Sequence, residues 1–279
     1  MINSKRKNKL NYFITGVSSG IGAELTRQLV DDGHNVFGTG RRIAELLALQ
    51  SELITCTGKF YFEIGDVLDS GFLEQAKVRF EQKFGGEIDV LIPNAGYVCR
   101  GNFTELGSAD YKHQLDVNLN SVIRLVDLFM GNIKSNKGQI VFMGSMFATR
   151  SLPGFSAYTI SKVGIKALAE GLFYELQDSG VAVTLITPGF ITSDIRNRGS
   201  RGIYTQQKLE QTPQFLEVDT KKAVSVMLKG IKKKKHEQVV GFHAVLLIFI
   251  MKYFPVIFDG CYRLYLSKLS RSAGSSEKQ

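Results

Sequence analysis

The sequence predicts one α/β domain, built as a doubly wound parallel sheet of about seven strands with helices on both faces. Short runs rich in Val, Ile and Phe alternate with longer helical patterns up to about residue 242. Most of these runs do not alternate with polar residues, which is typical of strands buried on both faces of a parallel sheet. No linker rich in Pro, Gly or Ser interrupts the pattern, so we predict a single domain over residues 11–242.

The elements follow in chain order, and right-handed crossovers are expected between the parallel strands. The predicted strands are residues 12–15, 35–39, 59–64, 88–92, 139–144, 181–187 and 238–242. The predicted helices include residues 21–31, 72–83, 109–133, 156–179 and 220–234. Residues 192–213 are rich in Arg, Gly and Gln, and we predict a lid over a substrate site there.

The net charge of +9 is concentrated in a few segments. It comes largely from the basic N-terminal segment 1–10, from residues 232–235 and from the end of the chain around Lys268 and Arg271, without interleaved aromatic residues. This distribution is typical of a solvated basic surface, or of one attracted to anionic lipid headgroups, and it argues against nucleic-acid binding. The N-terminal segment also lacks the apolar core of a secretory signal.

The three cysteines, Cys56, Cys99 and Cys261, lie far apart in the sequence. Their spacing fits neither a disulfide framework nor a metal site, and no His stands beside them as a partner for a nucleophile. We therefore predict a cytoplasmic protein in a reducing compartment, with no bound metal and with all three cysteines as packing residues.

Residues 243–279 form an apolar and basic C-terminal extension. The apolar run 244–251 precedes Pro255, and the polar positions Asp259 and Arg263 are spaced four apart, as on one helical face. A bilayer span needs about 20 apolar residues, so this segment is too short and too broken to cross a membrane alone. Three roles stay open: a helix lying in a membrane interface, a cap over the substrate cleft, and a subunit contact.

A glycine-rich turn follows the first predicted strand and opens the first helix, with the sequence Thr15-Gly16-Val17-Ser18-Ser19-Gly20-Ile21-Gly22. Glycines at such a turn let the backbone approach a pyrophosphate closely, and the helix N-terminus adds free N–H groups and a partial positive charge. We therefore predict a Rossmann-type sheet with a dinucleotide site. The predicted cofactor contacts here are Gly16, Ser18, Ser19, Gly20, Ile21 and Gly22.

The residues after the second predicted strand indicate which dinucleotide binds. An acidic residue about 20 positions after the glycine turn would hold the ribose 2′-hydroxyl of NAD, but Arg41 and Arg42 stand there instead. A guanidinium pairs well with a phosphate and gains little from a hydroxyl. The sequence therefore favours NADP(H), with Ser18 and Ser19 as further donors to its 2′-phosphate.

Tyr158 and Lys162 stand four residues apart in a predicted helix and so share one of its faces. One positive charge at about 4 Å, in an effective dielectric near 20, is worth about 4 kcal/mol, which corresponds to lowering a phenol pKa by about three units. A tyrosine so placed can exchange a proton near neutral pH. Ser145 follows a predicted strand, at the sheet edge where sites in such folds gather, and its hydroxyl is suited to bind a carbonyl oxygen.

Taken in order, these motifs resemble the short-chain dehydrogenase/reductase family in its compact branch, over roughly residues 11–242. The family's T-G-x-x-x-G-x-G pattern falls on the glycine turn. Its N-N-A-G pattern falls on Pro93-Asn94-Ala95-Gly96, with proline in place of the first asparagine. The resemblance implies a catalytic tetrad of Asn118, Ser145, Tyr158 and Lys162. It also implies cofactor contacts at Asp66, Val67, Asn94, Ala95, Gly96, Tyr158, Lys162, Pro188, Gly189, Ile191 and Thr192.

The resemblance further implies hydride transfer between the nicotinamide and a carbonyl carbon, with Tyr158 supplying or removing the proton on oxygen. Lys162 would lower the phenol pKa and bind the nicotinamide ribose, and Ser145 would orient the carbonyl. Asn118 would hold a water that links Lys162 to solvent. Family members commonly pair through the helices predicted at 109–133 and 156–179, so a homo-oligomer, dimer or tetramer, is expected.

The substrate is predicted from the residues around the serine and from the extension. The flanking side chains are mostly apolar: Met143, Met146, Phe147, Leu152 and Phe155. The family's membrane-associated lipid reductases carry comparable extensions, so we predict a lipophilic ketone, such as a long-chain 3-keto lipid of the 3-ketosphinganine kind or a steroid- or retinoid-like carbonyl. The alternatives are a reductase of a small soluble ketone, a cofactor-binding regulator without catalysis, and a sugar-nucleotide epimerase, which usually has a larger C-terminal domain.

Overall fold

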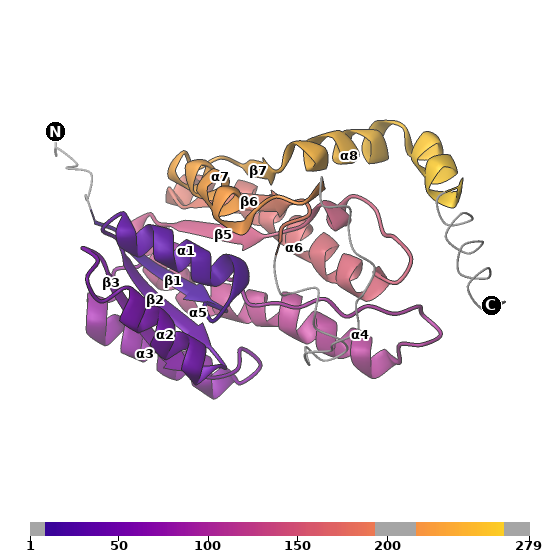
Figure 1. The fold of residues 1–279 in the computed structure, drawn as a ribbon. Coiled ribbons are helices and arrows are strands. Elements are labelled where there is room, and N and C mark those ends of the chain that lie inside the picture. The colour runs from indigo at the N-terminus through magenta and orange to yellow at the C-terminus, as the bar shows by residue number, and fades with distance from the viewer. Residues whose placement is uncertain (1–8, 193–215, 265–279) are drawn as a thin grey trace.

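Seven parallel strands form one sheet in the order β3-β2-β1-β4-β5-β6-β7 (Figure 1). The structure is a computed structural model, and it describes residues 9–192 and 216–264. The strands are β1 Asn11–Thr15, β2 Asn35–Gly40, β3 Lys59–Ile64, β4 Val90–Ile92, β5 Gln139–Met143, β6 Ala182–Pro188 and β7 Glu237–Val240. The strand order reverses between β1 and β4, and in such sheets ligands bind outside the carboxyl ends of the strands at this point. The predicted doubly wound fold is confirmed.

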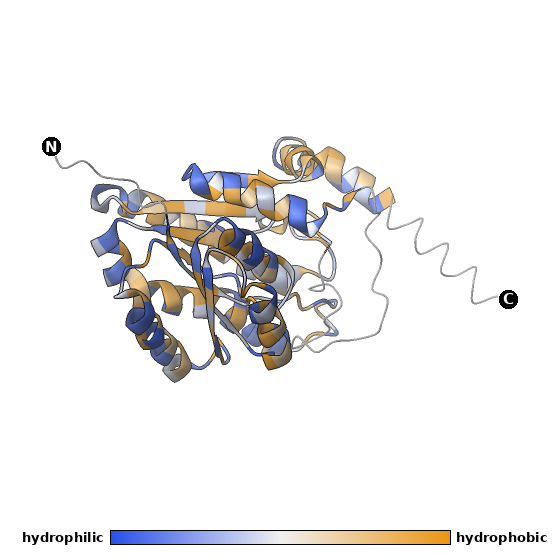
Figure 2. Ribbon diagram, turned by 60° about the vertical axis from the view of Figure 1, so that its left-hand side comes forward, coloured by the Kyte–Doolittle hydropathy of each residue, from blue (hydrophilic) through white to orange (hydrophobic). Residues whose placement is uncertain are grey.

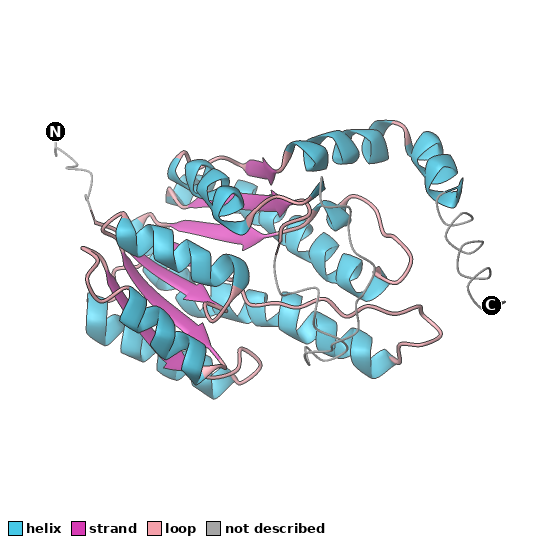
Figure 3. Cartoon of the chain, in the orientation of Figure 1, coloured by secondary structure: helices cyan, strands magenta, loops and turns pink. Residues whose placement is uncertain are grey.

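Helices cover both faces of the sheet (Figure 3). One layer consists of α1 Gly20–Asp31, α2 Ile43–Glu52 and α7 Thr220–Lys232, and the other of α3 Ser70–Phe84, α5 Ser121–Asn136 and α6 Ser156–Glu175. Both faces of the central sheet are therefore buried, which explains why the central strands are mostly apolar, as Figure 2 shows. In the second layer, four phenylalanine rings contact one another around the sheet: Phe13, Phe37, Phe80 and Phe129.

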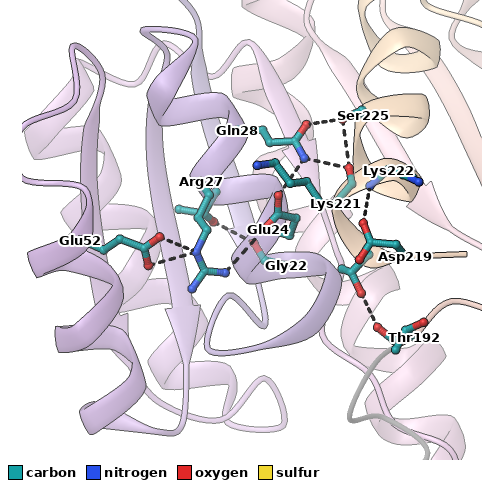
Figure 4. Close-up of polar contacts among 12 residues, drawn as sticks. Gly22, Glu24, Arg27, Gln28, Glu52, Thr192, Asp219, Lys221, Lys222 and Ser225 are labelled. Atoms are coloured by element: carbon teal, nitrogen blue, oxygen red, sulfur yellow. Dashed lines mark hydrogen bonds and ion pairs between the residues drawn. The ribbon is translucent and has the colours of Figure 1, made fainter.

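Polar contacts fix α1 between its neighbours α2 and α7 (Figure 4). The Gln28 side chain on α1 donates to the Lys221 carbonyl at 3.0 Å and accepts from the Ser225 hydroxyl at 2.9 Å, both on α7. On the other side, the Arg27 guanidinium binds the Glu52 carboxylate at the end of α2 at 2.9 Å. These contacts hold the helix whose N-terminus opens at the carboxyl edge of the sheet.

Several predicted boundaries differ from the observed elements. The helix predicted over 109–133 is divided into α4 Ser108–Leu115, a π-helical turn Asp116–Asn120 and α5, because the Ser121 N–H reaches back five residues to the Asp116 carbonyl. The last predicted strand ends at Val240, two residues early. Helix α2 was not predicted from the sequence, since it buries only Leu46 and Leu49 and so carries a weak periodic signal.

Two helices of the C-terminal extension follow β7, namely α8 Phe242–Tyr253 and a helix Pro255–Leu264, and they meet at an angle of 112°. We call them the C-terminal helix pair; they lie beyond the carboxyl edge of the sheet, at the upper right of Figure 1. Cys261 on the second helix is exposed, so the prediction that it packs inside the protein is wrong. Apart from Thr192, the predicted lid lies outside the described residues.

Candidate active site

A cleft of about 530 Å³ runs along the carboxyl edge of the sheet, from the glycine turn to the C-terminal helix pair. It collects nearly all of the predicted site residues, which come from the glycine turn, the strand ends and α6. Those that line it are Gly16, Ser18, Ser19, Gly20, Ile21, Gly22, Arg41, Asp66, Val67, Asn94, Ala95, Gly96, Asn118, Ser145, Tyr158, Lys162, Pro188, Gly189 and Ile191. Arg42 and Thr192 are not among the lining residues, and their predicted contacts with the cofactor stay predictions.

The glycine turn has the geometry of an anion cradle. Gly16 has a φ of +74°, a conformation that side-chain-bearing residues rarely adopt, and a Cβ there would lie 2.8 Å from the Ala95 Cα. A Cβ on Gly22 would lie 2.2 Å from the Gly16 carbonyl oxygen. The first turn of α1 carries no acidic side chain, so nothing opposes the partial positive charge of the helix N-terminus. The turn therefore leaves its backbone open to a pyrophosphate.

The segment after β4 is fastened to this turn by Thr15 and Asn94. The Thr15 hydroxyl accepts hydrogen bonds from the backbone N–H groups of Asn94 and Ala95 at 3.1 and 3.0 Å. The Asn94 amide donates to the carbonyls of Thr15 and Gly16 at 2.9 and 3.2 Å. Thr15 is thus a positioning residue that the list of predicted contacts omits, although it stands in the quoted motif. The network is complete with Pro93 in place of the family's asparagine.

At the end of the cleft beside β2 and β3, the two arginines take different positions. The Arg41 guanidinium lines the cleft and lies 3.2 Å from the Asp66 carboxylate, with both side chains more than a third exposed. The Arg42 guanidinium lies behind the glycine turn, where it donates to the Ser18 hydroxyl at 3.2 Å and pairs with Glu45. A 2′-phosphate at this end of the cleft would therefore meet Arg41 directly and Arg42 through Ser18.

Ser145, Tyr158 and Lys162 meet in the middle of the cleft. Ser145 lies just past β5, and its hydroxyl forms a hydrogen bond with that of Tyr158. Lys162, one turn further along α6, donates from Nζ to the Met143 carbonyl at 2.8 Å, and its Nζ lies 5.6 Å from the centroid of the Tyr158 ring. The predicted shared face of α6 is confirmed. A phenol, a serine hydroxyl and an ammonium thus lie close together in the cleft.

The predicted lowering of the phenol pKa is wrong for the chain without its ligands. Burial raises the pKa of Tyr158 to about 12, although the hydrogen bond with Ser145 acts in the opposite direction. Burial also lowers the pKa of Lys162 to about 8. The physical cause is the same for both groups, because removal of water disfavours whichever form is charged. In addition, the ammonium is directed at the Met143 carbonyl and over the ring.

Asn118 lies in the π-helical turn and is almost fully buried. Its side-chain oxygen accepts from the Tyr97 N–H at 3.1 Å, and its amide donates to the Tyr97 carbonyl and to the Ser161 hydroxyl. Gln114 on α4 adds a second donor to the Tyr97 carbonyl. Asn118 therefore joins the segment after β4 to α6 at Ser161, the residue between Tyr158 and Lys162 that directly precedes Lys162. Both of its amide hydrogens are used in this way, and its predicted role in holding a water stays a prediction.

The other half of the cleft is apolar and combines the predicted residues near Ser145 with the C-terminal helix pair. Met146, Phe147, Ala244 and Met251 form one buried cluster. The cleft is further lined by Met143, Leu152, Phe155, Phe190, Leu247, Phe258 and Tyr262. The open question about the extension is thereby answered in part, because the inner side of the helix pair caps this end of the cleft.

Two contacts attach the helix pair to the domain. The Arg150 guanidinium forms an ion pair with Asp259 and lies 5.9 Å from the centroid of the Phe258 ring. The Phe190 N–H donates to His243 Nε2 at 3.0 Å, and the two rings stack. Sequence reasoning did not find these contacts, because they join positions more than 50 apart and leave no local pattern.

Comparison with known proteins gives the same family that the motifs indicate. Residues 11–202 match the family model described as short chain dehydrogenase. The chain is 28% identical, over 65% of its length and 73% of the relative, to the 3-oxoacyl-(acyl-carrier-protein) reductase of Escherichia coli. It is 30% identical, over 65% of its length and 75% of the relative, to the NADPH-dependent pterin aldehyde reductase of Arabidopsis thaliana.

Solved structures share the fold. An alcohol dehydrogenase from Thermococcus sibiricus, complexed with 5-hydroxy-NADP, matches with a TM-score of 0.72 at 21% identity over 84% of this chain and 96% of that one. A short-chain dehydrogenase from Sphingobium yanoikuyae, in complex with NADPH, matches with a TM-score of 0.73 at 22% identity over 92% and 95%. Because the sequence identities are only 21% and 22%, these two matches show that the fold is shared and do not assign a function.

Proposed function

This chain belongs to the short-chain dehydrogenase/reductase family of oxidoreductases, and on that premise we propose that it reduces a lipophilic ketone with NADP(H). The observation that carries the proposal is the position of Ser145, Tyr158 and Lys162 in one cleft. The glycine cradle and Arg41 lie on one side of them, and an apolar chamber lies on the other. Such a cleft is suited to bring a dinucleotide and an apolar substrate together at a proton donor.

Each member of the central group has a role that follows from its contacts. The nicotinamide, when bound, would supply the hydride. The Tyr158 hydroxyl is protonated at neutral pH, since burial raises its pKa to about 12, and it would give its proton to the carbonyl oxygen. Ser145, already bonded to that hydroxyl, would hold the same oxygen. The Lys162 ammonium would stabilise the phenolate that this proton transfer leaves behind.

NADP(H) fits the adenosine end of the cleft better than NAD(H). Arg41 lines it, and Arg42 supports Ser18 from behind. The Asp66 carboxylate pairs with Arg41 and is not directed alone at a ribose. The NADPH dependence named for the Arabidopsis relative supports the same choice.

Replacing Arg41 with alanine tests this assignment. Loss of a charge-assisted contact to phosphate is worth about 1.5–3 kcal/mol, so we expect Arg41→Ala to raise the KM for NADPH by about 10- to 100-fold. The KM for NADH should stay within about threefold, because no 2′-phosphate is present. The matched control is Arg79→Ala, which breaks another exposed arginine–carboxylate pair, with Glu63, away from the cleft. If Arg41→Ala changed the KM values for NADPH and NADH by the same factor, Arg41 would not contact the 2′-phosphate.

The apolar chamber supports a lipophilic substrate. Its walls come from three separate parts of the chain, represented by Phe147, Phe190 and Met251. Burial of apolar substrate surface contributes roughly 25 cal/mol per Å² removed from water, so a long alkyl or polycyclic group would gain much more here than a small ketone. The relative from Escherichia coli is named as a reductase of 3-oxoacyl groups, which is consistent with an acyl-chain ketone.

A substrate panel tests the proposed class. Ketones of increasing chain length, and steroid- and retinoid-like carbonyls, are assayed with NADPH and NADH in detergent. We expect kcat/KM with NADPH to rise with apolar surface and to exceed that of small polar ketones by at least about 100-fold, since about three to four buried methylenes already account for that ratio. Turnover of small polar ketones alone would overturn the lipophilic assignment.

The remaining assignments are part of the same proposal. We place the enzyme in the cytoplasm as a homo-oligomer, with peripheral contact to a membrane through its C-terminal extension. The domain over residues 11–242 would carry the chemistry, and residues 243–279 would add the substrate cap.

A further inference from the structure

The C-terminal helix pair has an outer side that is as apolar as its inner side. We call this side the outer apolar face; the helices that carry it are largely orange, that is hydrophobic, at the upper right of Figure 2. Its exposed members are Phe242, Val245, Leu246, Phe249, Tyr253, Phe254, Val256, Ile257 and Leu264. Val256 is 82% exposed and Phe242 is 84% exposed. A contiguous apolar surface of this kind marks an interaction site.

The helix pair is held in place from its inner side, whereas the side chains of the outer apolar face are exposed. Met251 is buried in the chamber cluster, and Leu247 and Phe258 line the cleft. The ion pair between Arg150 and Asp259 fastens the second helix. The pair therefore forms a wall with one side toward the substrate chamber and the other toward the surroundings.

The charged residues beside this face indicate what kind of partner it binds. Lys252 and Arg263 are exposed on the two helices, whereas the carboxylate of Asp259 is paired with Arg150. The Lys252 Nζ lies 5.3 Å from the centroid of the Tyr253 ring, and Tyr253 in turn contacts Phe249. Aromatic residues and lysines at the margin of an apolar surface are typical of helices at a membrane–water interface. The sequence continues with Lys268 and Arg271, so the basic character extends beyond the described residues.

Two other arrangements agree less well with these observations. Across a symmetric contact with a second copy, the same two cations would approach their equivalents, and within residues 242–264 the one carboxylate, that of Asp259, is already paired with Arg150. As for a bilayer span, no single helix in the described part of the chain is long and apolar enough for one. The two helices of the pair are long and apolar enough only when taken together. However, they meet at a bend of 112°, and the inner side of the pair packs on the domain. An anionic bilayer surface can bury the apolar side chains and attract the two cations at the same time.

We propose that the outer apolar face docks on an anionic lipid bilayer, so that the wall of the substrate chamber lies against the membrane surface. The consequence rests on the proposed function: a lipophilic ketone dissolved in the bilayer would reach the chamber past the helix pair, without crossing water. Phe249 and Val256 would enter the acyl region, and Lys252 and Arg263 would contact headgroup phosphates.

Vesicle flotation of the full chain tests the docking. The probes are vesicles of phosphatidylcholine alone and of phosphatidylcholine with phosphatidylserine. The variant is Phe249→Ser/Val256→Ser, which removes two outer side chains that do not line the cleft. The matched control is Ile54→Ser/Val78→Ser, which removes two side chains of similar exposure on α2–β3 and α3. We expect at least about tenfold weaker vesicle binding for the first variant and a change within about twofold for the control.

The outcomes separate the docking from the proposed function. Binding that is stronger with phosphatidylserine, and lost in the Phe249→Ser/Val256→Ser variant alone, supports docking. Absence of binding by the wild type, equal loss in both variants, or conversion of a dimer to a monomer by the first variant overturns it. Reduction of a detergent-dissolved ketone is measured in parallel and should be equal in all three proteins. If vesicles are bound but no lipophilic ketone is reduced, the docking stands and the proposed function fails.

Discussion

Replacing Tyr158 with phenylalanine should lower kcat/KM for ketone reduction by about 10²- to 10⁴-fold, the usual contribution of a positioned general acid. The substitution removes one oxygen and leaves the ring, which packs edge-on against Phe147 with the centroids 6.0 Å apart. The carbonyl oxygen would then lack a proton donor, and Ser145 would lose its partner. The Kd for NADPH, measured by fluorescence titration, should change by less than about threefold, because the glycine cradle and Arg41 are untouched.

A matched control is Tyr111→Phe. The Tyr111 hydroxyl lies 2.5 Å from the hydroxyl of Ser156, so this variant also removes a tyrosine–serine hydrogen bond, but outside the cleft. Each loss should lower the free energy of unfolding by about 0.5–1.5 kcal/mol, whereas only Tyr158→Phe should affect turnover. If Tyr158→Phe retains more than about a tenth of the wild-type rate, another group must supply the proton.

Much of the fold is predictable because its signals are local. Strands buried on both faces are mostly apolar without alternation, and Phe13 and Phe142 illustrate this with no exposed surface. The glycine turn is visible because its backbone geometry excludes side chains at Gly16 and Gly22. Helix α2 was missed because a short helix with two buried leucines resembles an irregular surface segment.

The parts of the site that could not be predicted depend on contacts between distant segments. Arg41 and Arg42 are neighbours in the sequence, yet only the fold shows that one lines the cleft and the other lies behind Ser18. Residues 244–251 of the extension are apolar without interruption, so their periodicity does not reveal which of them face the chamber. The ion pair between Arg150 and Asp259, which decides this, joins residues 109 positions apart.

The pKa of Tyr158 is the most instructive difference. Spacing alone indicated a lysine close enough to lower it, and the two residues do share a face of α6. Two facts cannot be deduced from the sequence: how far the pair is removed from water, and that the Lys162 Nζ donates to the Met143 carbonyl. Desolvation therefore outweighs the attraction, and the pH dependence of the enzyme should follow the lysine rather than the tyrosine.

Replacing Lys162 with methionine should lower kcat/KM for ketone reduction by about 10²- to 10³-fold, and it should also change the pH profile. In the wild type, burial lowers the pKa of Lys162 to about 8, so the ammonium is present at lower pH and is lost as the pH rises through that value. Tyr158 keeps its proton throughout this range, because its pKa is raised to about 12. Wild-type kcat/KM should therefore be constant at low pH and fall above about pH 8, approaching tenfold per pH unit as the ammonium disappears.

The Lys162→Met variant should show a low rate that no longer falls above about pH 8, because the titrating group has been removed. Lys162→Arg keeps the charge at high pH, so its profile should also be flat there, with a rate set by how well the guanidinium reaches the Met143 carbonyl. The matched control is Lys166→Met, one turn further along α6, where the lysine pairs with Glu170 on the surface. A fall above about pH 8 that survives in Lys162→Met would assign the titration to another group and would separate the lysine from proton transfer at Tyr158.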